Sequence, residues 1–404
     1  MNQITSVKSL NRLSKRASKI RPSATMALNS KTKKLKNLGN DIINMSVGEP
    51  DFEAPIQALF AAIQAITNGQ TGYTPPAGIM ELRQAIANYI LENSGITFSP
   101  EQIITSAGGK QPLYNVFQVI CDYDDEVILP SPYWVSYPEQ IRLSGARPVV
   151  IQCNESTGFK LTAELLRESI TQKTKAVVLT SPNNPTGSVY SEIELKEIGE
   201  VLLEYPNILI ISDEIYDKFV YEGSHFSLPS IFPDLLNRTI ITNGFSKVFS
   251  MPGWRLGYIA APLDIAVAIS NFQSHATGSP ATISQYAGIA AIQNFDNKMV
   301  EEYKKRRDLL VNGLNEIGGI RCYMPEGAFY VFPNISNFIG KKYKNVEITS
   351  SDVFCSLLLE EQLLSVVPGE AFGEPNNIRL NFAVSNELIH ESLNRLKNFT
   401  SLID

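Results

Sequence analysis

The chain has 404 residues, a length that allows two domains or one large elaborated domain. Hydrophobic residues make up 44% and charged residues 19% of it, which excludes a coiled coil, a collagen-like chain and a wholly disordered chain. Because the formal net charge is -6, the molecule has no electrostatic reason to bind nucleic acid or acidic lipid, and we expect small molecules or a second copy of the chain as partners.

The N-terminal segment is basic, since every charged residue before Asp41 is a lysine or an arginine. An organellar transit peptide can have this composition. The spacing of apolar residues such as Leu10, Leu13, Leu28 and Leu35 instead favours an ordered amphipathic arm with a solvated charged face.

The four cysteines form no Cys-x-x-Cys pair, and the three histidines lie far apart in the sequence, so we expect no metal site and no disulfide framework. No apolar run approaches the roughly 20 residues that a membrane span needs. These features predict a cytoplasmic protein with reduced thiols and no membrane association.

From about residue 100 to about residue 260, apolar runs alternate with helical patterns, which indicates a parallel sheet covered by helices on both faces. The strand candidates are β-branched or continuously apolar: 103–106, 126–129, 148–152, 176–180, 208–212, 239–242 and 256–260. The helix candidates between them include 110–120, 162–170 and 191–204. The last opens with Ser191 and Glu194, the pattern of a capping box.

After residue 262 the pattern predicts long helices at 264–275 and 279–314, strands at 328–332, 364–367 and 378–382, and a closing helix at 386–399. These elements form a smaller α+β domain, which the strand-like segment 42–47 is expected to join. We therefore predict an N-terminal arm and part of the small domain at 1–50, a large domain at 51–300 and the rest of the small domain at 301–404. A cleft should separate the two domains.

Ligands of open parallel sheets bind at the carboxyl ends of the strands, and several polar segments follow strand candidates there. The segment Ser106-Ala107-Gly108-Gly109-Lys110 leaves a strand and starts a helix, so its backbone N–H groups can approach an anion such as phosphate. It is not a P-loop, because Gln111 stands where that motif requires Ser or Thr. A plain tight turn is the alternative.

Two more polar residues follow strand candidates. Asn184 lies between Pro182 and Pro185, which stiffen the backbone and can hold its amide at a fixed point. Asp213 ends the apolar run 208–211, where burial raises the pKa of a carboxyl group unless a cation pairs with it. A plain loop at Asn184 and a helix N-cap at Asp213 are the alternatives.

Basic residues also follow buried segments. Lys247 comes after the strand candidate 239–242, with Arg255 close behind it in the chain. A lone lysine is usually a surface charge, but a lysine desolvated among cations is a good nucleophile for a carbonyl group. Arg379 lies within an apolar strand candidate and is expected to face the cleft, where a fixed guanidinium can bind a carboxylate through two hydrogen bonds.

Together these segments resemble the class I aminotransferases, enzymes of fold type I that use pyridoxal 5'-phosphate. The resemblance runs from about residue 10 to the C-terminus, and it implies an α/β fold with a mostly parallel seven-stranded sheet in a large domain, plus a smaller discontinuous α+β domain. Its motifs occur in the family's order: Gly48-Glu49-Pro50-Asp51-Phe52, Tyr73-Thr74-Pro75-Pro76-Ala77-Gly78, Ser131-Pro132-Tyr133-Trp134, Ser181-Pro182-Asn183-Asn184-Pro185-Thr186-Gly187, Ser212-Asp213-Glu214-Ile215-Tyr216, Ser246-Lys247 with Arg255, and Asn377-Ile378-Arg379-Leu380.

The resemblance implies that Lys247 binds the cofactor covalently and later moves a proton between the substrate and the cofactor. Asp213 would pair with the protonated ring nitrogen. Asn184 and Tyr216 would hydrogen-bond the phenolic oxygen of the ring, and Trp134 would stack on its face.

The remaining carried-over roles concern the substrate and the phosphate. Arg379 would bind the substrate α-carboxylate, helped by the backbone of Gly48. The backbone N–H groups of Gly109 and Lys110 would bind the phosphate together with Arg255. Tyr73 of a neighbouring subunit would complete this site, which implies a homodimer. The chain departs from the family at Gly244, where many members have a hydroxyl side chain, so Ser246 is not assigned to the phosphate.

Further segments around Arg21, Lys110 and Trp134 are similar to the bacterial-type aspartate aminotransferases, in which a lysine after the glycine pair binds the distal carboxylate. This likeness implies transfer of the amino group from L-aspartate to 2-oxoglutarate by a ping-pong mechanism, with prephenate as a further substrate assisted by Arg21. Three alternatives remain open. They are an aminotransferase for alanine, kynurenine or aromatic amino acids, a carbon–sulfur lyase on the same fold, and an aminotransferase-like transcription regulator, for which the short N-terminal arm leaves no DNA-binding domain.

Overall fold

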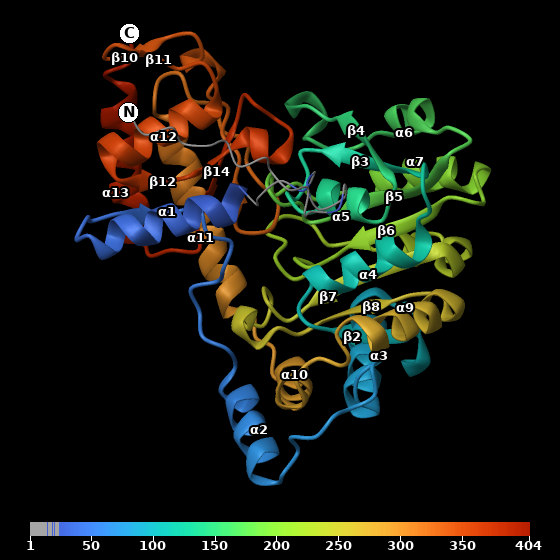
Figure 1. The fold of residues 1–404 in the computed structure, drawn as a ribbon. Coiled ribbons are helices and arrows are strands. Elements are labelled where there is room, and N and C mark those ends of the chain that lie inside the picture. The colour runs from blue at the N-terminus through green and yellow to red at the C-terminus, as the bar shows by residue number, and fades with distance from the viewer. Residues whose placement is uncertain (1–13, 15–17, 19, 21–23) are drawn as a thin grey trace, which may run out of the picture.

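One central sheet of seven strands organises the chain, whose computed structural model describes residues 14, 18, 20 and 24–404 (Figure 1). The strand order is β2-β8-β7-β6-β5-β3-β4, and only β8 runs antiparallel to its neighbours. The strands are β2 (Ile103–Ser106), β3 (Glu126–Ser131), β4 (Arg147–Gln152), β5 (Thr174–Thr180), β6 (Leu209–Asp213), β7 (Thr239–Gly244) and β8 (Gly257–Ala260). All seven predicted strands are present, and the mostly parallel sheet is confirmed.

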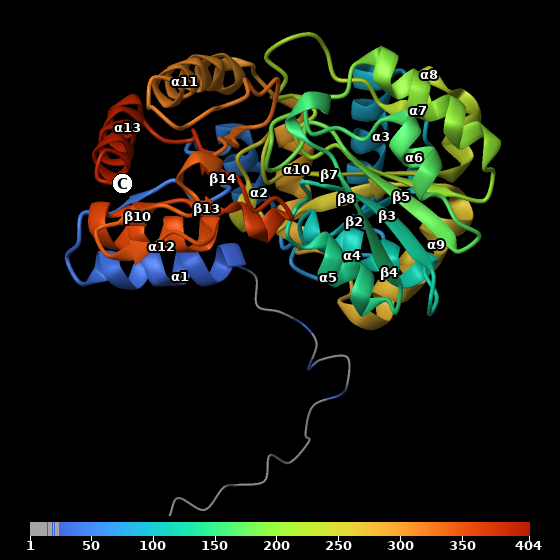
Figure 2. The ribbon, with the colours of Figure 1, turned by 90° about the horizontal axis from the view of Figure 1, so that it is seen from above.

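Helices cover both faces of this sheet, so its central strands are buried on both sides (Figure 2). On one face α4 (Lys110–Ile120), α5 (Tyr137–Leu143) and α9 (Leu263–Ala276) share an apolar cluster with the strands. On the other face lie α6 (Ala163–Ser169), α7 (Glu192–Glu204) and α8 (Leu228–Ile231). The capping box before α7 is confirmed, with the backbone N–H of Glu194 donating to Ser191 Oγ at 3.3 Å.

A second lobe combines the C-terminal part of the chain with its beginning. The strand β1 (Ile43–Asn44) pairs in parallel with β12 (Leu364–Ser365), so the predicted strand at 42–47 is present in this lobe. The other elements of the lobe are α1 (Ala24–Asn37), α11 (Lys298–Asn315), α12 (Ser351–Gln362), α13 (Asn386–Thr400), the sheet of β9 (Tyr330–Val331), β13 (Val367–Pro368) and β14 (Ile378–Asn381), and the hairpin of β10 (Lys342–Tyr343) and β11 (Val346–Glu347). The domain boundaries at residues 50 and 300 stay a prediction.

The predicted helix 279–314 is wrong as a single element. It is two helices, α10 (Thr282–Gln293) and α11, separated by residues 294–297. Asn294 leaves the helical backbone region, and Asp296 Oδ1 accepts a hydrogen bond from the backbone N–H of Lys298 at 3.1 Å. Short Asn and Asp side chains compete in this way with helical hydrogen bonds, and the break lets the chain pass from the first lobe to the second (Figure 1).

Two helices near the N-terminal end of the first lobe, α2 (Ile56–Thr67) and α3 (Met80–Ser94), were not predicted. The predicted amphipathic arm is described continuously from α1 onward, where Leu28 and Leu35 are half-buried, and Leu10, Leu13 and Arg21 lie outside the described residues. Within the described part of the chain, no helix has the length and apolar character to cross a membrane.

Candidate active site

Three neighbouring parallel strands bring the predicted polar residues to one edge of the sheet. Asp213 is the last residue of β6, in register with Thr180 at the end of β5 and with Thr242 in β7. Asn184 follows β5, and Lys247 follows β7 after a short turn. The strand order therefore gathers side chains that are far apart in the sequence.

Asp213 is a buried carboxylate held by neutral donors. The hydroxyl of Tyr137 donates to its Oδ2 at 2.5 Å, and the backbone N–H of Ile215 donates to its Oδ1 at 3.2 Å. Burial raises the pKa of Asp213 to about 6, although both hydrogen bonds act in the opposite direction. The residues after Asp213 form a turn and not a helix, so the helix N-cap alternative is wrong.

Lys247 has an amine suited to attack a carbonyl group. Its Nζ donates a hydrogen bond to the backbone oxygen of Gly48 and lies 5.7 Å from the ring centre of Phe329. Burial lowers the pKa of Lys247 to about 8, and the nearby cation Arg379 adds to this effect against the opposing charge of Glu49. A lysine with such a pKa is partly deprotonated near neutral pH and can act as a nucleophile or a base.

Arg379 is a buried guanidinium with hydrogen-bonding capacity left over. Its Nη1 donates to Asn184 Oδ1 at 2.9 Å, and its Nη2 donates to the backbone oxygen of Ser46 at 2.6 Å. Its Nε is buried and, among the described residues, finds no acceptor. No described carboxylate forms an ion pair with Arg379, and burial lowers its pKa. A buried guanidinium in this state is ready to bind a carboxylate from outside the chain.

The glycine pair forms a narrow cradle at the start of α4. A Cβ on Gly108 would collide with the guanidinium of Arg255, and a Cβ on Gly257 would lie 2.6 Å from the backbone nitrogen of Gly109. Gly108 also has a φ of +78°, which side chains rarely adopt. The backbone of Gly109 and the first N–H groups of α4 are thus open to a close-fitting anion beside Arg255.

Lys110 and Trp134 lie together at the mouth of the site. The Nζ of Lys110 is 5.1 Å from the ring centre of Trp134, and the pKa of Lys110 is lowered by burial and, to a smaller extent, by Arg255. A cavity of about 760 Å³ opens over Lys110 and Arg255, with Asp352 and Glu370 of the second lobe on its opposite wall. The cleft expected between the two lobes is therefore present.

Two tyrosines of the site were missed in the sequence. Tyr330, on β9, lies within hydrogen-bond distance of Tyr216, with 2.8 Å between the two hydroxyl oxygens, and the guanidinium of Arg379 stacks 4.5 Å from its ring centre. Tyr137 contacts Asp213. Tyr330 stands in the aromatic run from Phe329 to Phe332, and Tyr137 follows the aromatic pair Tyr133-Trp134, so only a three-dimensional contact distinguishes each from its aromatic neighbours. Tyr73, expected to act in the site of a neighbouring subunit, is fully exposed on the loop after α2 in this chain, and its role stays a prediction.

The comparisons with known proteins agree with this geometry. The model of the family described as aminotransferase class I and II matches residues 40–396. The chain is 44% identical to the aspartate aminotransferase of Bacillus subtilis, over 96% of this chain and 98% of that protein. It is 43% identical to the probable aspartate/prephenate aminotransferase of Aquifex aeolicus, over 95% and 98%. The crystal structure of the aspartate aminotransferase from Rhizobium meliloti is similar with a TM-score of 0.94 and 37% identity, covering 97% of this chain and all of that one.

The unpaired guanidinium of Arg379 generates a prediction. Maleate, a small dicarboxylate, should raise the midpoint of thermal unfolding, and at 100 times its Kd the gain in the free energy of unfolding should be about 2.7 kcal/mol. Arg379→Met should abolish this gain, because the carboxylate loses its binding group. The control is Arg321→Met, which removes an exposed arginine paired with Glu155 and should leave the gain unchanged. Equal gains in the protein and in Arg379→Met would contradict this role for Arg379.

Proposed function

This chain belongs to the class I and II aminotransferases, and from that premise we propose that it transfers the amino group of L-aspartate to 2-oxoglutarate, giving oxaloacetate and L-glutamate. The observation that carries this substrate choice is the pair of cations Arg379 and Lys110. Neither forms an ion pair with a described carboxylate, although burial lowers the pKa of both. A dicarboxylate substrate would supply one carboxylate for each of these two cations.

The residues present fit pyridoxal 5'-phosphate, which we propose as the cofactor. Gly108 lets the guanidinium of Arg255 approach the start of α4 closely, and the cavity beside Ala107, Lys110 and Arg255 gives a phosphate access to them. Asp213 offers a buried carboxylate without a described cation partner, as a ring nitrogen that carries a proton requires. Lys247 offers the amine. When bound, the cofactor supplies an aldehyde that accepts the amino group and a ring that withdraws electrons from the substrate.

The side chains of the site have separate roles in this reaction. Arg379 binds the substrate α-carboxylate and so orients the Cα–H bond, while Asn184 holds the guanidinium from the other lobe. Lys247 Nζ takes the proton from the substrate Cα and would give it up to the cofactor, a task for which a pKa of about 8 is suited. Tyr216 and Asn184 supply hydrogen bonds to the phenolic oxygen of the cofactor, and Trp134 covers the ring. Asp213 keeps its negative charge beside the ring nitrogen.

The test of this function is direct. The absorbance of the purified, cofactor-loaded protein should change on addition of L-aspartate and return on addition of 2-oxoglutarate, and steady-state assays over a panel of amino acids should rank L-aspartate first. Lys247→Ala should show neither change, because the proton-moving amine is gone. Release of pyruvate from cystathionine without such a cycle would replace transamination by carbon–sulfur lyase chemistry.

Lys110→Ala should separate the substrate classes. The backbone N–H at this position remains, so cofactor binding should persist, whereas kcat/KM for L-aspartate should fall about 30- to 1000-fold because the distal carboxylate loses its partner. The kcat/KM for L-alanine, which has no distal carboxylate, is the internal control and should change little. Unchanged kinetics with L-aspartate would favour an aminotransferase for alanine, kynurenine or aromatic amino acids.

Prephenate stays a prediction, supported by the name of the Aquifex aeolicus relative. The residue expected to assist it, Arg21, lies outside the described residues. We also propose a cytoplasmic location, and its support is that Cys121, Cys153, Cys322 and Cys355 are all unpaired and buried.

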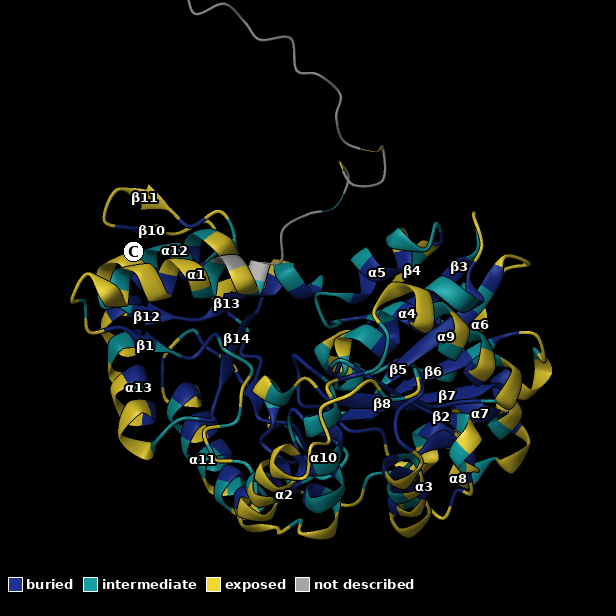
Figure 3. Ribbon diagram, turned by 60° about the horizontal axis from the view of Figure 1, so that its bottom comes forward, coloured by how far each residue is buried: buried dark blue, intermediate teal, exposed yellow. Residues whose placement is uncertain are grey.

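We propose further that the enzyme is a homodimer that pairs through α2. This helix lies at the periphery of the molecule, with exposed residues along it (Figure 3). It carries an exposed apolar stripe at helical spacing, in which each residue is more than half accessible: Ile56, Phe60, Ile63 and Ile66. A second copy of the chain would bury the stripe. The fully exposed Tyr73 on the following loop would then lie at the interface, where it could reach the phosphate site of the neighbouring subunit.

The double substitution Phe60→Glu and Ile63→Asp should convert the dimer to monomers and lower transamination strongly, because two charges would be buried at the interface. Light scattering after size-exclusion chromatography measures the mass. The control is Ile193→Glu, an exposed apolar residue on α7, which should leave both the mass and the activity unchanged. A double variant that remains dimeric would place the interface elsewhere.

A further inference from the structure

Tyr137 is the first residue of α5, and it reaches under the site to Asp213. Its side chain is fully buried, and its hydroxyl oxygen lies 2.5 Å from Asp213 Oδ2 and 3.1 Å from Thr180 Oγ1. Because a hydroxyl group has one proton, the bond to the carboxylate takes the proton of Tyr137, and Thr180 is then the donor to the tyrosine oxygen. Thr180, Tyr137 and Asp213 form a directed chain of hydrogen bonds in which each bond strengthens the next.

The position of Tyr137 is fixed by its surroundings. Its ring packs edge-on against Trp134, with 5.3 Å between the ring centres, and belongs to the apolar cluster under α4 and α5. Thr180 and Asp213 are partners in register on adjacent strands, so the acceptor and the supporting donor are set by the sheet itself. The tyrosine hydroxyl therefore meets a carboxylate of fixed orientation.

No described cation balances the charge of Asp213, so hydrogen bonds alone stabilise its ionised form. Burial raises the pKa of Asp213, Tyr137 and the backbone N–H of Ile215 lower it, and the neighbouring charge of Glu214 raises it slightly. Tyr216, on the following turn, is a buried neutral phenol because burial raises its pKa. Tyr137 is thus the only described side chain that donates a hydrogen bond to Asp213.

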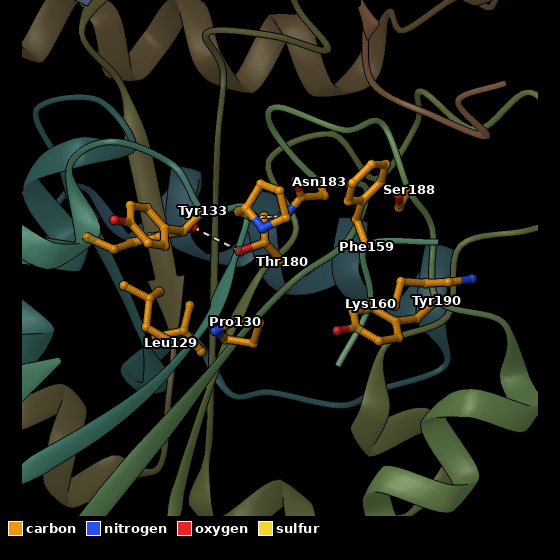
Figure 4. Close-up of a pocket in the computed structure, with 12 residues that line it drawn as sticks. Leu129, Pro130, Tyr133, Phe159, Lys160, Thr180, Asn183, Ser188 and Tyr190 are labelled. Atoms are coloured by element: carbon orange, nitrogen blue, oxygen red, sulfur yellow. Dashed lines mark hydrogen bonds between the residues drawn. The ribbon is translucent and has the colours of Figure 1, made fainter. Parts of the chain in front are cut away.

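A small cavity of about 10 Å³ lies beside Tyr137 and Thr180, lined by residues of β3 and β5 and of the loops after them, including Leu129, Pro130 and Asn183 (Figure 4). A cavity of this size holds one water molecule at most. The titratable groups around it are Tyr133, Tyr190 and Lys160, and Lys160 is bound to Glu194 and to the backbone oxygen of Val189.

We propose that Tyr137 is a positioning residue for the cofactor: its hydroxyl group, supported by Thr180, keeps Asp213 ionised and aimed at the ring nitrogen. The cofactor part of this inference rests on the proposed function. The hydrogen bond to Asp213 and its effect on ionisation do not, and they can be measured in the full-length protein freed of cofactor.

The sign of the pH dependence follows from the raised pKa of Asp213. The pKa of an unfolded aspartate is about 3.9, and that of Asp213 in the folded protein is about 6. Stability therefore falls as the pH rises between these two values and then levels off. Loss of the Tyr137 hydroxyl should move the upper end of this range to higher pH. The stability of Tyr137→Phe should then fall further between about pH 6 and about pH 8, where the stability of the parent protein no longer changes with pH.

The experiment follows the midpoint of thermal unfolding of the cofactor-free protein from about pH 5 to about pH 8.5 for the parent, Tyr137→Phe, Asp213→Asn and the double variant. The deficit of Tyr137→Phe should grow with pH in the parent background and stay constant in the Asp213→Asn background. Thr180→Val should show the same trend more weakly, and it replaces Tyr137→Phe if that variant does not fold. A deficit that is equal at all pH values would make Tyr137 merely structural and overturn the proposal.

A second readout is the Kd for pyridoxal 5'-phosphate at about pH 8. We expect it to rise about tenfold in Tyr137→Phe, since a hydrogen bond to a charged group is lost. The matched control is Tyr190→Phe, another buried tyrosine at the same cavity, whose hydroxyl accepts from the backbone N–H of Leu161 and touches no carboxylate. It should leave the Kd and the pH profile unchanged. If the parent binds no cofactor, the proposed function fails, while the pH profiles still test the link between Tyr137 and Asp213.

Discussion

The common edge at which β5, β6 and β7 end is the constraint on which the site depends. Helices cover both faces of the sheet, so this edge is where residues of central strands can meet a ligand. Asn184, Asp213 and Lys247 each follow or end one of these strands, so the parallel sheet brings an amide, an acid and an amine to the same edge. The second lobe then adds Arg379, from β14, opposite them.

Buried charged side chains outside the cleft have partners, whereas two of those inside it have no described partner of opposite charge. Arg307 is nearly inaccessible and is paired with Glu222 and Asp308, while Arg238 donates to three backbone oxygens at the end of α7. Such partners repay the cost of desolvation. In the cleft, Asp213 and Arg379 have no described partner of opposite charge, and burial shifts the pKa of each toward its neutral form. Under the proposed function, the cofactor and the substrate would supply the opposite charges that Asp213 and Arg379 lack.

The sequence was sufficient for the sheet because buried parallel strands leave continuous apolar runs between turn-forming residues, and Ser191 and Glu194 marked a helix start by their hydrogen bonds. It was insufficient where tertiary contacts decide. The helix at 279–314 was divided by Asn294 and Asp296, whose effect depends on how α11 packs in the second lobe. Helix α2 has no polar face to contrast with an apolar one, because Ala58, Ala62 and Ala65 form its buried side and its exposed side carries isoleucines and Phe60.

The candidate site was predictable to the extent that its residues break a local pattern. A lysine after a buried strand, an arginine inside one and a glycine pair before a helix are each unusual enough to notice. Tyr137 and Tyr330 are not unusual, because an aromatic residue in an apolar segment is the ordinary composition of a core. Their contribution lies in the hydroxyl group, and which carboxylate or phenol that group meets is decided by the fold.

Arg379 couples substrate binding to the relative position of the two lobes. Its guanidinium donates to Asn184 of the first lobe and to the backbone of Ser46, which follows β1 in the second, so one side chain already joins both before any ligand binds. A carboxylate that binds the remaining Nε shares this guanidinium and strengthens its fixed orientation. Because Asn184 also belongs to the proposed cofactor site, a displacement of the lobes would alter substrate and cofactor contacts together. In the proposed mechanism, the guanidinium of Arg379 would therefore make the orientation of the substrate depend on the relative position of the two lobes.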